Sequence, residues 1–376
     1  MNPLVFIEDG VISAVSSKTH QEVPRNATVI DLKVDRGDAI LAPGFVDIHM
    51  HGGAGLDVMR ATAADLPRLN QFLREHGVTG YFPTTVAAPL DQTCRALERL
   101  ADAIEAAGNL SASNGDAQAR PLGIHLEGPF LSHKRRGVHP PEFLVEPGLE
   151  IFERLWQAAR GQVRVMTIAP ELPGALEVIA EAARRNICVS IGHSDATLDA
   201  ARAGVRAGAR HATHTFNAMR PLDHRDPGIL AEVLVDHQLS ADIIVDGIHV
   251  APEVVQLFLQ AKGIDRAVLI TDAISAAGMP DGTYQLGPIQ VEVKDGKCTM
   301  EGKLAGSVLT MDRAVRNVTQ FTGWSLQNAV RAATVNPARA VGLAQHGRLV
   351  QGAEANIVVL SPIGEVRQTF VRGRAS

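Results

Sequence analysis

The chain has 376 residues, of which 45% are hydrophobic and 20% charged, a composition typical of globular proteins. Its net charge of −5 and the lack of a basic run argue against a nucleic-acid-binding role. We expect neither a signal peptide nor a membrane span, because the first residues lack a basic region and no apolar run reaches about 18 residues. Cys94, Cys188 and Cys298 fit no disulfide or zinc-ribbon spacing, which favours a reducing cytoplasm.

The sequence predicts short strands at both ends of the chain, because apolar residues there do not recur with a helical period. The Asp9-Gly10 pair is a hairpin-turn signal between the first two of them. The predicted terminal strands are Leu4–Glu8, Val11–Ser16, Val29–Leu32, Ala39–Leu41, Ala355–Leu360 and Glu365–Val371. Because the termini of one domain often lie close together, we expect residues 1–44 and 346–376 to form a small β-sandwich domain.

Strands and amphipathic helices alternate through residues 45–345. The predicted strands are Phe45–His51, Val78–Thr85, Leu122–Glu127, Val163–Ala169, Ile187–His193, Arg210–Phe216, Ala241–Gly247 and Ala267–Asp272. The predicted helices are Ala63–His76, Asp91–Ala107, Leu149–Ala159, Ala175–Arg185, Leu198–Ala207, Gly228–Asp236 and Pro252–Ala261. This alternation predicts the α/β class and a (β/α)8 TIM-type barrel. The alternative, an open doubly wound sheet, would need a dinucleotide-binding turn, which Gly52–Gly55 imitates only weakly.

Two stretches do not fit a plain barrel. Ser111–Ala119 is small and polar and is interpreted as a mobile loop before the third strand. Gly282–Gly306 is interpreted as β-hairpins after the eighth strand, with a turn at Lys294–Lys297.

The segment from Pro43 to His51 ends a predicted strand in two histidines. His49 and His51 are spaced i, i+2, so in a strand their side chains point to one face. Two imidazoles on one face can share a metal ion. The alternative is a pair of barrel-lining or surface histidines.

Other predicted strands also end in residues suited to metal binding or acid–base chemistry, where barrel enzymes place their catalytic groups. Glu127, His193 and His214 would form a set of one carboxylate and two imidazoles that leaves a position open for water. His125 fits a core role as well as a functional one, Asp195 is expected to cap the next helix, and His211 is interpreted as structural. The roles of His133 and His224 stay open. Four further histidines lie at predicted surface or helix positions and are expected to have no functional role: His20, His76, His237 and His346.

Six motifs, APGFVDIHMHG, GIHLEGPF, IGHSDAT, THTFNAMRPL, DGIHV and LITDAISAAG, resemble the amidohydrolase superfamily. More narrowly, they resemble its deacetylases of N-acetylglucosamine 6-phosphate, and the resemblance covers nearly the whole chain. It implies a metal-dependent hydrolase that releases acetate from this amino-sugar phosphate. By position, it implies Glu127, His193 and His214 as the main metal ligands and Asp272 as the catalytic carboxylate. His49 and His51 leave open a second metal site bridged by Glu127.

The resemblance also implies a set of substrate contacts. These are Val138, His139, Asn217, Ala218, Arg225, His249, Leu304, Ala305 and Gly306. Arg225 suits bidentate phosphate binding, in its own or a neighbouring subunit of a homodimer, although it could instead pair with Asp223 or Asp226. His139 would donate to the acetyl oxygen as negative charge develops there.

The mechanism expected is metal-assisted amide hydrolysis, in which Asp272 takes the proton of the attacking water and passes it to the departing amine. Zinc is the first expectation for the metal, with iron, cobalt or manganese as alternatives. Deacetylation of N-acetylgalactosamine 6-phosphate, a nucleobase aminohydrolase and an inactive scaffold are the alternatives considered. No lysine lies in Val163–Ala169, which argues against relatives that use a carbamylated lysine.

Overall fold

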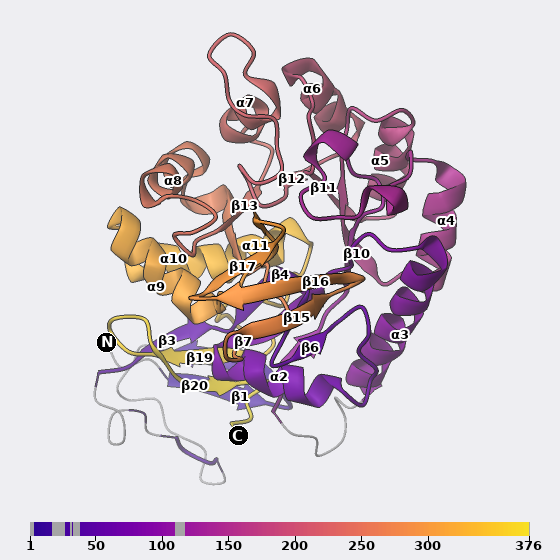
Figure 1. The fold of residues 1–376 in the computed structure, drawn as a ribbon. Helices are drawn as coiled ribbons and strands as arrows, with labels where there is room; N and C mark the ends of the chain where they lie inside the picture. The colour runs from indigo at the N-terminus through magenta and orange to yellow at the C-terminus, as the bar shows by residue number, and fades with distance from the viewer. Residues whose placement is uncertain (1–3, 17–26, 31, 33–37, 110–116, 376) are drawn as a thin grey trace.

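The computed structural model describes residues 4–16, 27–30, 32, 38–109 and 117–375 (Figure 1). The first fourteen strands of the described chain are β1 Leu4–Glu8, β2 Val11–Ser16, β3 Ile40–Pro43, β4 Phe45–Met50, β5 Gly52–Gly53, β6 Leu56–Asp57, β7 Val78–Pro83, β8 Arg120–Pro121, β9 Ile124–Glu127, β10 Val163–Ile168, β11 Cys188–Ile191, β12 His211–Ala212, β13 Ala241–Ile244 and β14 Ala267–Ile270. The later strands are β15 Gly282–Leu286, β16 Ile289–Lys294, β17 Lys297–Met300, β18 Lys303–Leu304, β19 Ile357–Leu360 and β20 Val366–Phe370.

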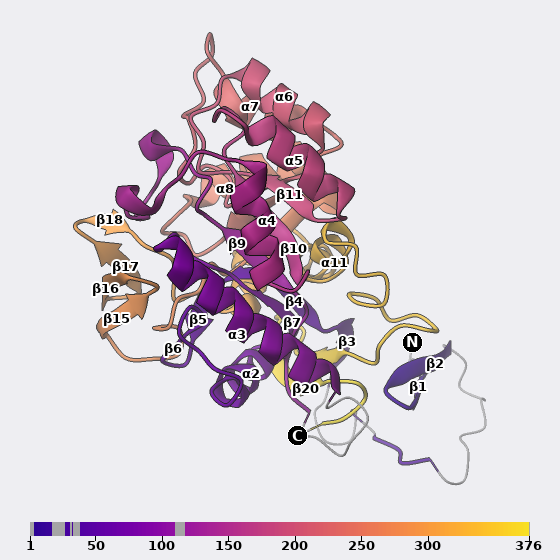
Figure 2. The same ribbon diagram turned by 90° about the vertical axis from the view of Figure 1, so that its right-hand side faces the viewer.

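The helices follow the predicted alternation closely. They are α2 Leu66–Glu75, α3 Leu90–Asn109, α4 Leu149–Ala158, α5 Ala175–Arg184, α6 Leu198–Ala207, α7 Gly228–Val235, α8 Pro252–Arg266, α9 Met311–Thr322, α10 Leu326–Ala333 and α11 Val335–Ala340, with short 3₁₀ turns η2 His133–Arg135 and η3 Pro141–Phe143. Helices α3 to α6 pack side by side along one side of the molecule (Figure 2). Each predicted helix exists, and its ends agree within a few residues, apart from α8, which runs on to Arg266 through a kink at Gly263.

The central strands run parallel, as the α/β prediction requires. Strands β9, β10, β11 and β12 form one parallel ladder, β4, β7 and β8 a second, and β13 and β14 a third. Backbone hydrogen bonds connect these ladders; for example, Thr85 N donates to His125 O, Ala212 N to Ser240 O, and Asp272 N to His49 O. The carboxyl ends of these strands therefore lie near one another.

Strand β12 is shorter than the predicted Arg210–Phe216. Only His211 and Ala212 pair with β11, and residues beyond them leave the extended conformation. His214 and Phe216 have φ of 30° and 79°, a left-handed backbone that no strand accommodates. The chain therefore leaves the strand direction just after β12, at His214, which the sequence predicts to be a metal ligand.

The two ends of the chain lie together on one side of the molecule (Figure 1). β3 pairs with β19, which pairs with β20, so an N-terminal strand and two C-terminal strands share one sheet. The hairpin of β1 and β2 turns at Asp9-Gly10 as predicted, and Ile12 N donates to Ala353 O. The strand expected at Val29–Leu32 is wrong for residues 29 and 30, which have no regular structure, and residue 31 lies outside the described residues.

After β14 the chain forms the antiparallel sheet β15–β18, as the hairpin prediction required. Apolar residues of this sheet pack against Val138 and Ile274. A bridge between Ala273 and Ser307 then returns the chain to the end of β14. Of the predicted loop Ser111–Ala119, residues 111–116 lie outside the described part of the chain. Among the described residues, no helix is both long enough and apolar enough to cross a bilayer.

Candidate active site

Six side chains meet at the carboxyl ends of the parallel strands, and all six are buried. They are His49 within β4, His51 just after it, Glu127 at the end of β9, His193 after β11, His214 after β12 and Asp272 after β14. Because parallel strands end at a common edge, residues far apart in the sequence reach one centre. The sequence prediction had chosen these same residues.

One oxygen of Glu127 faces the first pair of imidazoles. Glu127 Oε1 lies 3.2 Å from His193 Nε2 and 3.2 Å from His214 Nε2. The two Nε2 atoms are themselves 3.0 Å apart. These three groups are the predicted main metal set, and the structure brings them together.

The other oxygen of Glu127 faces the second pair. Glu127 Oε2 lies 3.6 Å from His49 Nε2 and 3.5 Å from His51 Nε2. Asp272 Oδ1 completes this group at 3.1 Å from His51 Nε2. Glu127 therefore stands between two groups of donors, as a bridging carboxylate would.

The second nitrogen of three of these imidazoles is fixed by a backbone carbonyl. Nδ1 of His51 donates to Thr84 O at 3.0 Å, that of His193 to Arg135 O at 3.0 Å, and that of His214 to Asn217 O at 3.2 Å. A carbonyl only accepts, so the proton sits on Nδ1 and the neutral ring presents a lone pair at Nε2. Metal-binding histidines are oriented in this way.

This tautomer makes the close approach of the Nε2 atoms informative. Two lone pairs 3.0 Å apart, at His193 and His214, repel unless a cation or a proton lies between them. The Nε2 atoms of His49 and His51 are 3.3 Å apart, but no carbonyl fixes the tautomer of His49, whose Nδ1 has no hydrogen-bond partner among the described residues. Imidazole nitrogens and carboxylate oxygens are the usual donors for zinc and related divalent ions. The donor set therefore fits a divalent metal.

His139 is close to the same centre but has the opposite tautomer. Its Nδ1 accepts from the backbone N–H of Ala87 at 3.1 Å, so the ring proton sits on Nε2. That Nε2 lies 3.6 Å from Glu127 Oε2. His139 thus presents an N–H donor to the site, whereas His193 and its neighbours present lone pairs. This geometry suits stabilisation of an oxyanion better than metal ligation.

Three of the converging residues have a strained backbone. His193, His214 and Asp272 have φ of 46°, 30° and 49°, in the left-handed region that non-glycine residues rarely adopt. Such strain persists only where surrounding contacts impose it, and it concentrates at functional sites. Each of these residues follows its strand by two positions, so the strain turns the side chain toward the common centre.

The electrostatics of the site favour ionised carboxylates. Burial alone would raise the pKa of Glu127 and Asp272, but the surrounding imidazoles outweigh it and hold both pKa values well below their usual range. Burial lowers the pKa of His193 to about 4. For His214 burial is outweighed by the hydrogen bond to Glu127 and by nearby carboxylates, which raise its pKa to about 9. With no ion bound, a proton therefore takes the position at His214 Nε2 that an ion would otherwise occupy, and the lone pair there is free only when an ion displaces this proton. Two carboxylates are thus kept charged in a buried cluster, as a cation requires.

Some of the predicted substrate contacts border this centre. Val138 is buried beside His139, and Ser307 N donates to Asp272 O, which draws the segment Leu304–Gly306 toward Asp272. The side-chain nitrogen of Asn217 is buried and has no hydrogen-bond partner among the described residues. A donor left in that state is available to a ligand.

His249 and Arg225 lie further out. His249 Nδ1 is 2.7 Å from Asp246 Oδ2, which orients the ring beyond β13. Arg225 is exposed on the loop between β12 and α7, which stands out from the body of the molecule (Figure 1). Within the described chain, Asp226 pairs with Arg220, and Asp223 pairs with His224 and accepts the backbone N–H of Arg225. The Arg225 guanidinium pairs with neither carboxylate. The structure does not bring Arg225 into the buried centre.

The predicted helix cap at Asp195 is wrong. Thr197 caps α6, because its side chain accepts from Ala200 N, and Asp195 lies two residues upstream. The Asp195 carboxylate instead accepts from Lys134 Nζ at 2.6 Å and Arg135 Nε at 2.7 Å. Capping residues are recognised by local spacing, whereas these partners lie some sixty residues away in the sequence.

Two buried carboxylates were missed by the sequence prediction. Asp47 accepts from Thr271 Oγ1 at 2.6 Å and so links β4 to β14 directly beneath the site. Asp242 accepts the backbone N–H of His214 and also contacts His211 Nε2 at 2.9 Å. An aspartate in the middle of an apolar strand was the available signal, since buried charge is costly unless it is bonded.

His125 and His211 form a layer below the site. His125 Nδ1 donates to Ile48 O at 3.0 Å and its Nε2 accepts from Thr167 at 2.8 Å. His211 contacts Ser240 and Asp242. Both rings are therefore satisfied by protein groups, in agreement with a structural role.

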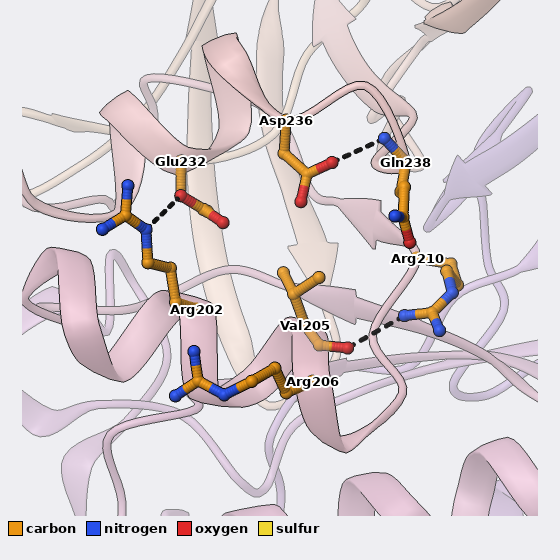
Figure 3. Close-up of a pocket in the computed structure, with 7 residues that line it drawn as sticks. All are labelled: Arg202, Val205, Arg206, Arg210, Glu232, Asp236 and Gln238. Atoms are coloured by element: carbon orange, nitrogen blue, oxygen red, sulfur yellow. Dashed lines mark hydrogen bonds and ion pairs between the residues drawn. The ribbon is translucent and has the colours of Figure 1, made fainter.

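A separate hollow of about 330 Å³ lies between α6 and α7 (Figure 3). Two of its arginines are bonded: Arg202 to Glu232, and Arg210 to the carbonyl of Val205. Arg210 precedes β12, so the hollow lies toward the amino ends of the strands, away from the site. None of the predicted site residues lines it.

Carboxylates and imidazoles gathered at the carboxyl ends of parallel strands define the site of a metal-dependent hydrolase of the α/β class. The chain belongs to the amidohydrolase family, whose model matches residues 40–375.

Curated relatives match almost the whole chain. It is 36% identical over 372 residues to the N-acetylglucosamine-6-phosphate deacetylase of Lysinibacillus sphaericus, covering 98% of this chain and 92% of the relative. It is 37% identical over 370 residues to the N-acetylgalactosamine-6-phosphate deacetylase of Escherichia coli O157:H7, covering 98% and 93%.

Among solved structures, the N-acetyl-D-glucosamine-6-phosphate deacetylase of Mycobacterium smegmatis has a TM-score of 0.88 and 36% identity, with 99% of this chain and 94% of that chain covered. The N-acetylglucosamine-6-phosphate deacetylase of Pasteurella multocida has a TM-score of 0.89 and 30% identity, with 100% and 94% covered.

Proposed function

We propose that the protein hydrolyses the acetamide of N-acetyl-D-glucosamine 6-phosphate, giving D-glucosamine 6-phosphate and acetate in amino-sugar catabolism. The observation that carries this proposal is the meeting of Glu127, two imidazole pairs and Asp272 beside an imidazole N–H donor. Relatives of that activity, at 35–38% identity over nearly the whole chain, support the choice of substrate.

The framework we propose is a (β/α)8 TIM-type barrel of residues 45–345. The three parallel ladders and the hydrogen bonds that connect them, including Asp272 N to His49 O, support closure of the strands. Residues 1–44 and 346–376 would form the small β-sandwich domain, with the shared sheet of β3, β19 and β20 as its support.

Glu127, His193 and His214 would hold the main divalent ion, and His49, His51 and Asp272 would hold or border a second one. The donor atoms of His49, His51 and Asp272 lie close enough to share one ion. Glu127 Oε1 lies 3.2 Å from both His193 Nε2 and His214 Nε2, and the donor atoms of Glu127, His193 and His139 also lie within reach of one ion. An ion bound there would acidify the attacking water and polarise the acetyl carbonyl. Zinc is the first choice for this donor set, and iron, cobalt and manganese are alternatives.

Asp272 and His139 would perform the proton transfer and charge stabilisation. Asp272 is kept ionised by its imidazole neighbours, so it can accept the proton of the attacking water and return it to the amine. His139 Nε2–H would donate to the acetyl oxygen as that oxygen gains charge, because its Nδ1 is occupied by Ala87 N.

The sugar phosphate would be held at the outer edge of this centre. Asn217, with its free side-chain N–H, and the backbone of Ala218 would contact the phosphate, with His249 beside them. Val138 and Leu304–Gly306 would border the sugar. Arg225 would supply the guanidinium, in its own subunit or across the interface of a homodimer. The three buried, unpaired cysteines suit our placement of the reaction in the cytoplasm.

Acetate release from a panel of N-acetyl-hexosamine phosphates, measured beside elemental analysis of protein purified without added metal, tests the proposal. We expect the glucosamine epimer to be used best and the unphosphorylated sugar poorly. Arg225→Ala should weaken use of the phosphorylated substrate by about 10- to 100-fold, the scale of a charge-assisted pair, and spare the free sugar.

Better use of the galactosamine epimer would replace the proposed substrate by the one that the Escherichia coli relative's name gives. Release of ammonia from nucleobases, without acetate from any sugar, would contradict the proposal outright. Neither the comparisons nor the site favours that second outcome, because the full-length relatives are deacetylases.

A further inference from the structure

We propose that Glu171 and Asp195 form a two-carboxylate brace that positions the metal ligand His193, and through one loop also His139. The inference rests on the proposed function in assigning a metal ion to His193 and the role of oxyanion donor to His139. Both carboxylates lie outside the predicted site residues. Neither faces the metal centre, and each acts through other groups, so both are positioning residues.

Glu171 holds the chain immediately after His193. Its Oε2 accepts from Ser194 Oγ at 2.7 Å, and its Oε1 accepts from Asp195 N at 2.6 Å. His193 itself has a left-handed φ of 46°. A non-glycine residue in this region costs of order 1–3 kcal/mol and needs surrounding contacts to impose it. The two short bonds to Glu171, one from a backbone N–H, are placed to do so.

Asp195 holds the loop that orients the ring of His193. Its two oxygens accept from Lys134 Nζ at 2.6 Å and from Arg135 Nε at 2.7 Å. The carbonyl of that same Arg135 accepts the Nδ1–H of His193 at 3.0 Å. The carboxylate therefore fixes, through one residue, the bond that sets the tautomer of a metal ligand. Ser132 N also donates to His193 O at 2.9 Å, so the loop contacts this residue twice.

The same loop carries the oxyanion donor. Arg136 Nη1 donates to His139 O at 2.8 Å, and His139 N donates to Arg136 O at 3.1 Å, which closes a tight turn around Gly137. The turn approaches the metal ligand so closely that a Cβ at Gly137 would lie 3.3 Å from His193 Cε1. Displacement of this loop would therefore move the metal ligand and the oxyanion donor together.

The second imidazole pair does not depend on this brace. The ring of His51 is oriented by the carbonyl of Thr84, just after β7, and the backbone N–H of His49 donates to Asp47, in β4. The contacts of this pair therefore come from the region of β4 and β7 and not from the loop. A purely structural role for Asp195 predicts equal weakening of both metal groups with falling stability. The brace predicts weakening at the main group alone.

Metal affinity of the apo-protein, measured by competition with a zinc chelator, tests this without substrate. The main group is isolated by working in the His51→Asn background. Asp195→Ala and Glu171→Gln are each expected to weaken zinc binding by about 10- to 100-fold, the usual effect of losing a partner that orients a metal ligand. Asp195→Glu, which keeps the charge, should recover part of the affinity.

Asp312→Asn is the matched control. Like Asp195, Asp312 is a carboxylate that accepts from an arginine, but it is more deeply buried, its other partner is a histidine, and it lies on α9, away from the loop. It should leave zinc affinity unchanged. If Asp195→Ala does not fold, Arg135→Gln replaces it, because this variant removes the guanidinium and keeps the carbonyl.

A zinc affinity within twofold of the parent in folded Asp195→Ala or Arg135→Gln would overturn the proposal. So would equal loss of zinc from Asp312→Asn. Because the titration contains no sugar, failure of the proposed deacetylation would leave this result interpretable, and the two failures can be told apart.

Discussion

Two layers of buried histidines lie one above the other in this molecule. In the lower layer, His125 and His211 each have both ring nitrogens bonded to protein groups. In the upper layer, the Nε2 atoms of His193 and His214 lie 3.0 Å apart, and each lies 3.2 Å from Glu127 Oε1. Both layers are equally buried, so burial does not separate them.

What separates the layers is the count of hydrogen-bond donors and acceptors. Thr167 supplies a proton to His125, so that ring is complete without any ligand. His193 spends its only proton on Arg135 O and is left with a lone pair directed at another lone pair. A buried imidazole that protein atoms cannot satisfy indicates a ligand site, and one that they do satisfy indicates structure.

Asp272→Asn is the strongest test of the upper layer. Asparagine keeps the size of the side chain but cannot accept the water proton or return one to the amine, so kcat should fall by about 100- to 10,000-fold. Steady-state kinetics beside metal analysis and thermal melting should show KM, metal at the main group and stability little changed. Recovery of activity with excess metal would instead make Asp272 a ligand only, and a large loss of stability with a small loss of rate would make it structural.

His193→Asn and His51→Asn separate the two metal groups. The first should lower metal content and activity together, because His193 and His214 share one oxygen of Glu127. The second should remove at most one ion and leave measurable turnover, because His51 belongs to the group around Asp272. Elemental analysis of both purified variants decides the ranking. Complete loss of metal from His51→Asn would reverse it.

The strands and most helices could be predicted from the sequence because the patterns that indicate them are local. Apolar runs that end in glycine or in a polar residue located the parallel strands, and the 3.6-residue period located seven helices. Helices α9 to α11 were not predicted, and β12 was predicted too long. The second error has a physical cause, since the positive φ of His214 and Phe216 is imposed by tertiary contacts rather than by local preference.

The candidate site was accessible for a different reason. The i, i+2 spacing of His49 and His51 and the position of Glu127 at a strand end place these side chains at one edge. The groups that hold them were not accessible. Asp47 reaches Thr271 across 224 positions of sequence, and Asp195 reaches Arg135 across 60. Such partners follow from the tertiary arrangement of the parallel strands, which no local pattern encodes.

His125→Leu tests the lower layer and should have a smaller effect. It leaves the carbonyl of Ile48 without the ring N–H that donates to it and removes one of the two partners of the Thr167 hydroxyl, and an unsatisfied buried group typically costs about 1–3 kcal/mol. Metal content at the main group should not change. Urea unfolding and elemental analysis together check this, and loss of the main metal without loss of stability would erase the distinction between the two layers.

Asp312→Asn should have the smallest effect on activity, and it serves as a reference for the Asp272→Asn prediction. It pairs with His76 Nδ1 at 3.0 Å, close to the 3.1 Å between Asp272 and His51, but among the described residues no second imidazole completes a donor group there. Burial opposes its charge, yet hydrogen bonds to His76 and Thr310 and the nearby Arg316 lower its pKa to about 2.

A carboxylate whose pKa is lower in the folded than in the unfolded chain stabilises the fold above the unfolded value of about 3.9, and this stabilisation is lost as pH falls toward 2. Asp312→Asn should therefore lower the free energy of unfolding by about 2 kcal/mol at pH 7, and the deficit should vanish between pH 4 and pH 2. Urea titrations of both proteins across that range measure the difference, in which acid effects on the metal site cancel. The kcat of Asp312→Asn should equal that of the parent protein. If Asp272→Asn behaved in the same way, losing acid-sensitive stability and keeping kcat, Asp272 would be an ion-pair partner like Asp312, and the upper layer would lose its proton acceptor.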